Sequence, residues 1–266
     1  MKSDNFTIIS CYTDIYTADA ELLKRSLKQF NLNNTQIEKY NNKSKDTKLS
    51  RKNWKANLKQ KPIFIKQKLE ELKSPVVWTD ADSVLLQYPE LLNTLDCDIA
   101  IWRPWHGIET GGTMYFNYSD GAFAVLNDWI NTYRDNATDG RNLTRTLIKL
   151  NPTFIDAVRP EDAREIAKIL RQVVNDYGLG KNFNSRIDGI SEDLKNISTK
   201  KDEVKIFNLP FTYNYFHIDN SLYARLLSNE PVPSLNDLNI VFAHTRGYYR
   251  YFKVFRNTEK RLKRNT

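Results

Sequence analysis

The residues best suited to chemistry in this chain are two carboxylates, Asp80 and Asp82, separated only by Ala81. They follow the apolar run 76–79, which has the composition of a buried strand in a parallel sheet. Along a strand, residues i and i+2 point to the same side, so both side chains can face one centre. Two like charges held together are costly unless a cation joins them, and carboxylate oxygens suit Mg²⁺ or Mn²⁺. We therefore predict a divalent-metal site here, and the alternative is a polar turn after a strand.

Strand and helix patterns alternate around this segment. Residues 6–10 are β-rich, and apolar residues at helical spacing follow Thr17, which we expect to cap that helix. Residues 99–102 and 113–117 are predicted strands, and Ser119 is the predicted N-cap of the next helix. Such alternation predicts an α/β layer fold.

The stretch 39–73 is polar and strongly basic, with twelve Lys and Arg residues against three acidic ones. Within it, we predict that Pro62 lies in the first turn of a helix whose apolar face includes Ile65 and Leu69. One interpretation is a solvated loop and helix. The other is a lobe that approaches a polyanion or a phosphate group.

The second half of the chain has a helical pattern over residues 141–200, with a clear helix beginning at Pro160. Strand patterns return at 204–207 and 239–243. No repeat, low-complexity segment or Gly/Ser linker divides the chain. We therefore expect one domain over residues 1–266, with 141–200 as a helical insertion.

The composition excludes several classes of protein. The chain has 266 residues, with 40 Lys and Arg against 32 Asp and Glu, a formal net charge of +8. No run approaches the about 20 apolar residues of a membrane-spanning helix, and two cysteines are too few for a disulfide framework. Residues 1–5 lead into the first strand without the apolar core of a signal peptide, so we expect a cytoplasmic protein.

Residues 75–91 resemble the Asp-X-Asp segment of GT-A nucleotide-diphospho-sugar transferases, in which a strand ends in the metal-binding motif and a second apolar strand follows. Five more segments resemble family-8-like glycosyltransferases and their phage and bacterial relatives, in the expected order: Tyr12-Thr13, 54–65, 112–117, 209–215 and 240–247. The resemblance covers most of the chain except 141–200.

The resemblance implies a single GT-A (Rossmann-like) domain, with a mixed, mostly parallel sheet, helices on both faces and the helical insertion. It implies metal-dependent transfer of a sugar from a nucleotide-diphosphate donor, with a UDP-sugar as first choice, to an acceptor hydroxyl. Its metal ligands would be Asp80, Asp82 and His244, with Mn²⁺ ahead of Mg²⁺ because imidazole suits Mn²⁺ better. For His244, the alternative is a hydrogen-bonded structural histidine.

The resemblance also implies the residues that contact the donor. Candidates for nucleotide-sugar binding are Tyr12, Thr13, Lys61, Asp80, Ala81, Arg103, Gly112, Thr113, Arg246 and Gly247. Among them, Lys61 and Arg246 would meet the pyrophosphate and Arg103 the donor sugar. The alternative for each of these three cations is a solvated surface side chain.

The acceptor side is less defined. An inverting enzyme needs a carboxylate base, for which Glu109 and Asp139 are candidates, whereas a retaining enzyme of this fold needs none. Asp139-Gly140 lies where members of the resembling family often carry Asp-Gln or Asp-Glu before a helix, and the Gln or Glu is missing here.

The acceptor itself would be a glycan or lipid-linked saccharide, or a hydroxymethylated DNA base. The basic, aromatic tail 248–266 could pack over the core, make peripheral contact with an anionic membrane, or bind nucleic acid. The rival class is a non-catalytic nucleic-acid-binding protein.

Overall fold

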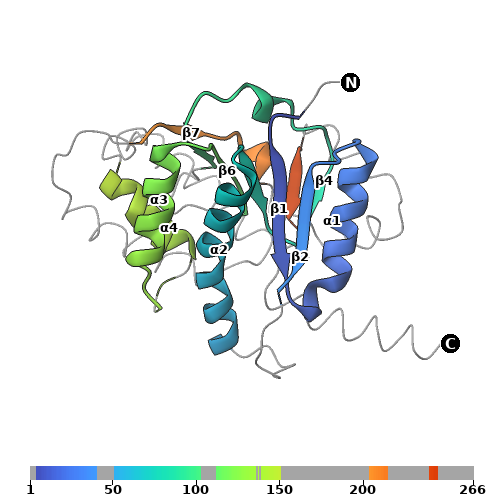
Figure 1. Ribbon diagram of the computed structural model, residues 1–266. Helices are drawn as coiled ribbons and strands as arrows, with labels where there is room; N and C mark the ends of the chain where they lie inside the picture. The colour runs from blue at the N-terminus through green and yellow to red at the C-terminus, as the bar shows by residue number, and fades with distance from the viewer. Residues whose placement is uncertain are drawn as a thin grey trace, which may run out of the picture.

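The computed structural model describes residues 4–40, 51–102, 112–135, 137, 139–150, 204–214 and 240–244. Strands and helices alternate along these residues and form layers on either side of a central sheet (Figure 1). The predicted insertion beyond residue 150, including the helix at Pro160, and the tail 248–266 lie outside the described residues.

The central sheet has six strands in the order β2-β1-β3-β6-β5-β7. Their bounds are β1 Thr7–Tyr12, β2 Thr35–Lys39, β3 Val76–Thr79, β5 Ile99–Ile101, β6 Thr113–Phe116 and β7 Ile206–Asn208. β6 runs antiparallel to both of its neighbours, and all other pairs in this sheet are parallel. The predicted α/β class with a mixed, mostly parallel sheet is confirmed.

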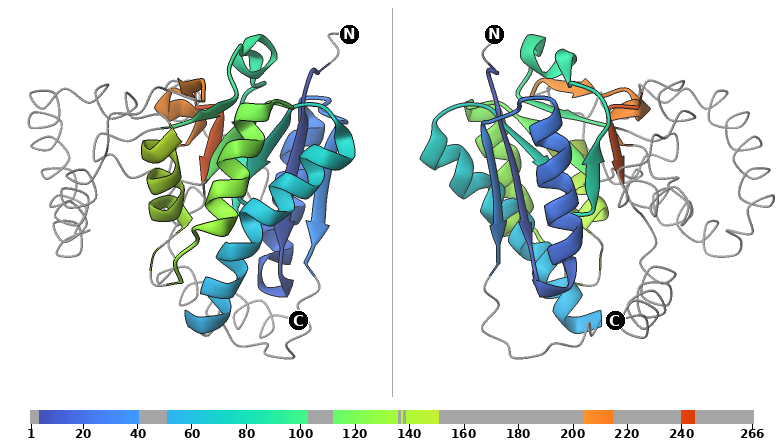
Figure 2. Two further views of the ribbon diagram at one scale, coloured as in Figure 1. Left: turned by 60° about the vertical axis from the view of Figure 1, so that its left-hand side comes forward. Right: turned by 90° about the vertical axis from the view of Figure 1, so that its right-hand side faces the viewer.

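A second sheet has two antiparallel strands, β4 and β8. β4 spans Ser83–Leu85 and β8 spans Phe242–His244. Short 3-10 helices connect other elements: η1 Asp14–Tyr16, η2 Glu90–Thr94 and η4 Phe211–Tyr213. The β4–β8 pair joins segments that are far apart in the sequence, and the two strands lie side by side in Figure 2.

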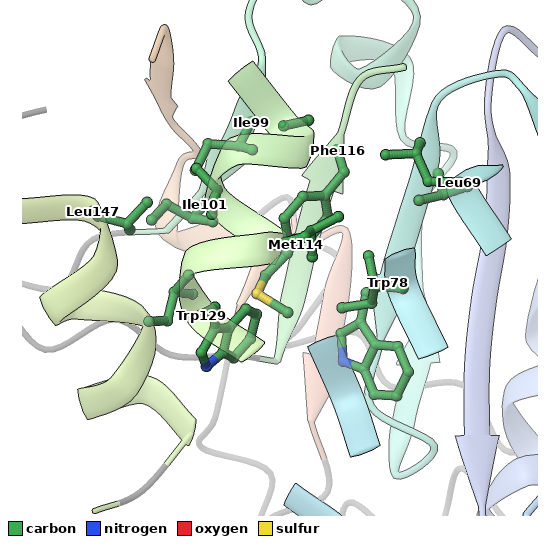
Figure 3. Close-up of a cluster of buried hydrophobic side chains, with 14 of the residues drawn as sticks. Leu69, Trp78, Ile99, Ile101, Met114, Phe116, Trp129 and Leu147 are labelled. Atoms are coloured by element: carbon green, nitrogen blue, oxygen red, sulfur yellow. The ribbon is translucent and has the colours of Figure 1, made fainter. Parts of the chain in front are cut away.

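Helices cover both faces of the central sheet. Their bounds are α1 Thr17–Gln29, α2 Arg51–Leu72, α3 Asp120–Asn131 and α4 Asp139–Leu150. On one face, α2, α3 and α4 pack in sequence and bury a core with Trp78, Met114 and Trp129 (Figure 3). On the other face, α1 and the β4–β8 pair bury Val77 and Tyr115. The opposite directions of Val77 and Trp78 follow from the two-residue period of a strand.

Ser119 is the N-cap of α3, as predicted, because its hydroxyl accepts a hydrogen bond from the amide of Ala122. The prediction for Thr17 is wrong, since it is the first residue of α1. Its hydroxyl donates to the carbonyl of Asp14 at 2.7 Å. The 3-10 turn η1 runs directly into the helix, so the N-cap position falls on Tyr16, which makes no side-chain capping bond.

The prediction for Pro62 is also wrong, because α2 begins at Arg51 and Pro62 lies in its interior. Proline in a helix removes one backbone hydrogen bond and costs about 3 kcal/mol. Full burial of an aliphatic side chain contributes about 1.5–3 kcal/mol, and both Ile65 and Leu69 are fully buried. We attribute the continuous helix to this burial, which offsets the proline.

None of the helices among the described residues combines the length and the apolar composition that a membrane span requires.

Candidate functional site

Asp80, Ala81 and Asp82 form the tight connection between β3 and β4. The amide of Ser83 donates to the carbonyl of Asp80 at 3.0 Å, which closes a turn over residues 80–83. The amide of Asp80 donates to the carbonyl of Gly112 at 2.9 Å, so the start of β6 holds the turn in place. The two carboxylates thus come together through a turn, and the strand alternation that we expected for them is not the cause.

His244 is the last residue of β8 and lies directly opposite Ser83 in the β4–β8 register. Residues opposite each other in an antiparallel pair point to the same face, which brings the imidazole to the turn. One potential ligand atom from each of Asp80, Asp82 and His244 lies within 4.8 Å of the other two. The structure therefore brings together the three residues that the sequence proposed as ligands.

The electrostatics of this cluster favour a cation. Burial raises the pKa of Asp82 well above its usual range, and the negative charges of Asp80 and Asp19 raise it further. Burial also raises the pKa of Asp80, and the charge of Asp139 adds to it, so the partial compensation by Lys61 does not restore the usual value. Two carboxylates and one imidazole could hold a divalent metal ion, which would relieve this repulsion.

Lys61 of α2 forms ion pairs with one of these acids and with Asp139. Its Nζ lies 2.9 Å from Oδ1 of Asp80 and 2.7 Å from Oδ2 of Asp139, the first residue of α4. The indole Nε1 of Trp78 donates to the same oxygen of Asp80 at 3.0 Å, and Nζ lies 5.2 Å from the Trp78 ring centroid. Lys61 is only 6% exposed, so it is not a solvated surface cation.

The two ion pairs set the charge states of their members. Burial alone would lower the pKa of Lys61, but the carboxylates of Asp139 and Asp80 outweigh it and raise that pKa. Burial alone would raise the pKa of Asp139, but the Lys61 ammonium outweighs it and leaves that pKa below its usual range. Lys61 is therefore charged and Asp139 ionised at neutral pH.

Gly112 and Thr113 form the wall beside His244. The Asn214 side chain accepts from the amide of Thr113 at 2.7 Å and donates to its carbonyl at 3.0 Å. A Cβ on Gly112 would lie 2.6 Å from Asn214 Oδ1 and 2.8 Å from His244 Cε1. Glycine is therefore required here by the close approach of the histidine ring.

The other predicted site residues divide into two groups. Tyr12 ends β1, Thr13 follows it, and the Lys24 ammonium lies 5.6 Å from the centroid of the Tyr12 ring. Ala81, at the centre of the turn, is buried. The remaining predicted residues lie outside the described residues: Arg103, Glu109, Arg246 and Gly247.

Sequence reasoning missed three residues that shape the site. Trp78 donates to Asp80, Ser83 contacts the His244 ring, and Asn214 holds the backbone of Thr113. Trp78 and Ser83 immediately flank the acidic pair, so proximity in sequence was an available signal. The partner of Ser83 was not predictable in this way, because the Ser83–His244 contact joins residues 161 positions apart.

No protein-family model matches the chain, and no curated protein matches it in sequence. Among solved structures, it is similar to a glycosyltransferase involved in the glycosylation of the major capsid of PBCV-1, at 11% identity and a TM-score of 0.41. That likeness covers 91% of this chain and 94% of the other.

Two further likenesses are to the glycosyltransferase GlyE of Streptococcus pneumoniae and to the galactosyltransferase LgtC, solved with donor and acceptor sugar analogs. Both are 11% identical, with TM-scores of 0.39 and 0.35. The likeness covers 93% of this chain and 55% of GlyE, and 91% of this chain and 87% of LgtC. Each of these three TM-scores is below 0.5, so the chemistry of this site has to be argued from its own residues.

Proposed function

We propose that this protein is a metal-dependent glycosyltransferase that moves a sugar from a nucleotide-diphosphate donor, with a UDP-sugar as first choice, to an acceptor hydroxyl. The observation that carries the proposal is the convergence of Asp80, Asp82 and His244 within 4.8 Å, next to the buried cation Lys61. A polar turn in a non-catalytic nucleic-acid-binding protein requires neither the histidine nor the buried lysine.

The metal in this proposal is Mn²⁺, with Mg²⁺ as the second choice, held by Asp80, Asp82 and His244. When bound, such an ion neutralises the negative charge that develops on a departing nucleoside diphosphate. The chain fixes one ligand in advance, because Lys61 and Trp78 both donate to Oδ1 of Asp80. In the contacts of the described residues, no hydrogen bond is donated to the other carboxylate oxygen of Asp80. We assign this oxygen to the cation.

In the proposal, Lys61 has a second role: its ammonium group is the positive charge that the anionic donor meets in its binding site. It is held between Asp80 and Asp139 at less than 3 Å from each, so it needs no reorganisation when an anionic donor arrives. Asp139 orients it and keeps it charged. The lowered pKa of Asp139 makes this carboxylate a weak proton acceptor. Glu109 therefore remains a candidate for the base as well as Asp139.

For the acceptor, we propose a glycan or lipid-linked saccharide ahead of a hydroxymethylated DNA base. For the two acceptors, we expect the binding of the protein to DNA and to liposomes to depend differently on salt. Affinity for double-stranded DNA that falls steeply and linearly on a log–log plot against salt would favour the DNA base, because phosphate contacts release counterions. Binding to anionic liposomes but not to DNA would favour a lipid-linked acceptor.

The donor half of the proposal is tested by hydrolysis of UDP-sugars with and without Mn²⁺. We expect hydrolysis by the wild type to require Mn²⁺, and Asp82→Asn to be slower by on the order of 100-fold, since several kcal/mol of charge stabilisation is lost. The matched control is Asp96→Asn, the same substitution at a carboxylate that is 93% exposed and pairs with the surface residue Lys205.

Asp96→Asn should hydrolyse the donor at the wild-type rate. A wild-type protein that neither binds nor cleaves any nucleotide sugar would end the transferase proposal. Equal loss of activity in Asp82→Asn and Asp96→Asn would show that the effect does not come from the metal cluster.

A further inference from the structure

Two hydroxyl groups contact the imidazole of His244, one at each ring nitrogen. Ser83 Oγ lies 2.9 Å from Nδ1, and Thr113 Oγ1 lies 3.3 Å from Nε2. His244 is 1% exposed, so its ring is surrounded by protein groups. The question is which nitrogen carries the proton, because only the other one can bind a cation.

The hydrogen bonds around Ser83 answer this question. Ser83 Oγ lies 2.6 Å from the carbonyl oxygen of Asp80, which can only accept, so the single hydroxyl proton of Ser83 is donated there. Thr79 Oγ1 donates to Ser83 Oγ at 2.8 Å, which uses one lone pair of the serine oxygen. The second lone pair faces Nδ1 of His244, so this nitrogen must be the donor of the remaining hydrogen bond.

We infer that Ser83, supported by Thr79, is a positioning residue that holds His244 in the Nδ1–H tautomer and aims the lone pair of Nε2 at the metal site. The inference rests on the proposed metal-binding role of His244. In the absence of a cation, the Thr113 hydroxyl, 3.3 Å from Nε2 and 3.4 Å from Thr79 Oγ1, can donate to the Nε2 lone pair that a metal ion would take.

The opposite tautomer fits the site poorly. With the proton on Nε2, Nδ1 would need the hydroxyl proton of Ser83. Ser83 Oγ and the Asp80 carbonyl would then meet at 2.6 Å with no proton between two acceptors. A proton on Nε2 would also block the nitrogen that faces Thr113 and Gly112, whose missing Cβ leaves room beside it.

The elements that carry these residues make the arrangement rigid. Thr79 ends β3, Ser83 begins β4, and His244 ends β8 opposite Ser83. Thr79 and Ser83 are 0% and 1% exposed. Outer partners of this kind orient a ligating histidine and raise its basicity as a ligand.

The test is ¹⁵N NMR of the imidazole nitrogens in the metal-free, full-length protein, at a pH where His244 is neutral. The signals of His244 are assigned by their loss in His244→Gln. We expect a protonated-type shift at Nδ1 and an unprotonated-type shift at Nε2. In Ser83→Ala, and one bond further away in Thr79→Val, we expect the population to move toward the Nε2–H tautomer.

Thr79→Ser, which keeps the hydroxyl, is the matched conservative variant and should retain the wild-type tautomer. Mn²⁺ affinity, measured with and without UDP, should weaken about 10- to 100-fold in Ser83→Ala and Thr79→Val but not in Thr79→Ser. Circular dichroism checks that each variant is folded, and if Ser83→Ala does not fold, the two Thr79 variants supply both readouts.

A wild-type His244 in the Nε2–H tautomer would overturn the inference, as would an unchanged tautomer and unchanged Mn²⁺ affinity in the folded variants that lack a hydroxyl. The Nδ1–H tautomer in a wild type that binds no Mn²⁺ would instead confirm the hydrogen-bond assignment and contradict the proposed metal site. The two failures are therefore distinguishable.

Discussion

Lys61 lies buried between two carboxylates that come from distant parts of the chain. In the sequence it is one of twelve cations in the stretch 39–73, and a solvated role was a reasonable alternative. In the structure it is buried between Asp80 and Asp139. Burial of a lysine depends on partners 19 and 78 positions away, which no local pattern reveals.

The acidic pair itself was predictable, because Asp80 and Asp82 follow a strongly apolar strand. His244 was predictable only through the resemblance to known transferases, since one histidine at a strand end has no distinctive local signal. The contact of Ser83 with His244 depends on the pairing of β4 with β8, which no local pattern reveals.

The buried position of Lys61 leads to a stability prediction. Lys61→Met keeps the length of the side chain but leaves Asp80 and Asp139 without their cation, so the free energy of unfolding should fall by about 3 kcal/mol. Urea denaturation followed by tryptophan fluorescence measures this change. The matched control, Lys205→Met, removes an exposed cation paired with Asp96 and should leave stability unchanged. Equal stability of Lys61→Met and wild type would contradict the buried ion pairs.

Gly112 leads to a prediction about metal affinity. In Gly112→Ala, the new methyl group would lie 2.8 Å from His244 Cε1, so the ring must move and Mn²⁺ affinity should fall by about tenfold or more. Calorimetric titration with Mn²⁺ measures this effect.

The control for this substitution is Gly121→Ala, in which the methyl group would lie 2.3 Å from Asp98, away from the site. Both variants should be less stable than the wild type, but only Gly112→Ala should lose metal affinity. The same affinity in both would mean that Gly112 does not limit the position of the histidine.

At the scale of elements, the sequence indicated the buried strands well. The predicted strand 76–79 matches β3, whereas β7 begins two residues later than the predicted strand 204–207. α2 was placed too late in the chain, because the rule for proline at a helix start does not include the burial that keeps a longer helix intact. The β4–β8 pairing could not be predicted from local patterns, since it joins the two ends of the site across most of the chain.

The link between α1 and β4 leads to a prediction at this scale. Ser26 is buried in α1, where its hydroxyl donates to the carbonyl of Leu23 at 2.7 Å and accepts from the amide of Leu85 at 2.9 Å. Ser26→Ala would leave the Leu85 amide buried and without this partner, so the free energy of unfolding should fall by about 1–3 kcal/mol.

Urea denaturation measures this loss. Thr94→Ala, which removes an exposed hydroxyl bonded to the carbonyl of Leu91, serves as the control and should change stability little. A drop for Thr94→Ala as large as that for Ser26→Ala would argue against a special role for the α1–β4 contact.

At the scale of the whole molecule, the net charge of +8 includes cations that form ion pairs inside the fold. Two buried cations of α2 are compensated within the fold, since Lys61 pairs with Asp80 and Asp139, and Lys68 pairs with Glu38 and Glu71. Within the basic run 39–73, Lys61 therefore serves the acidic site and Lys68 an ion-pair network with β2 and its own helix.

The α/β class and the mixed, mostly parallel sheet were predictable at this scale, because alternating strand and helix patterns leave few other layer arrangements. The reversed direction of β6 and the position of β4–β8 beside the sheet come from long-range packing. Together these features bring the end of β3, the start of β6 and the end of β8 to one place.

The most direct test of this account is a Mn²⁺ titration of the wild type and Asp82→Asn, followed by electron paramagnetic resonance, with and without UDP. We expect one bound Mn²⁺ per wild-type chain and an affinity weaker by about tenfold or more in Asp82→Asn, which loses a ligand charge. A wild type that binds no Mn²⁺ under either condition, or an Asp82→Asn variant that binds it as tightly, would contradict the metal centre on which the proposed transfer reaction depends.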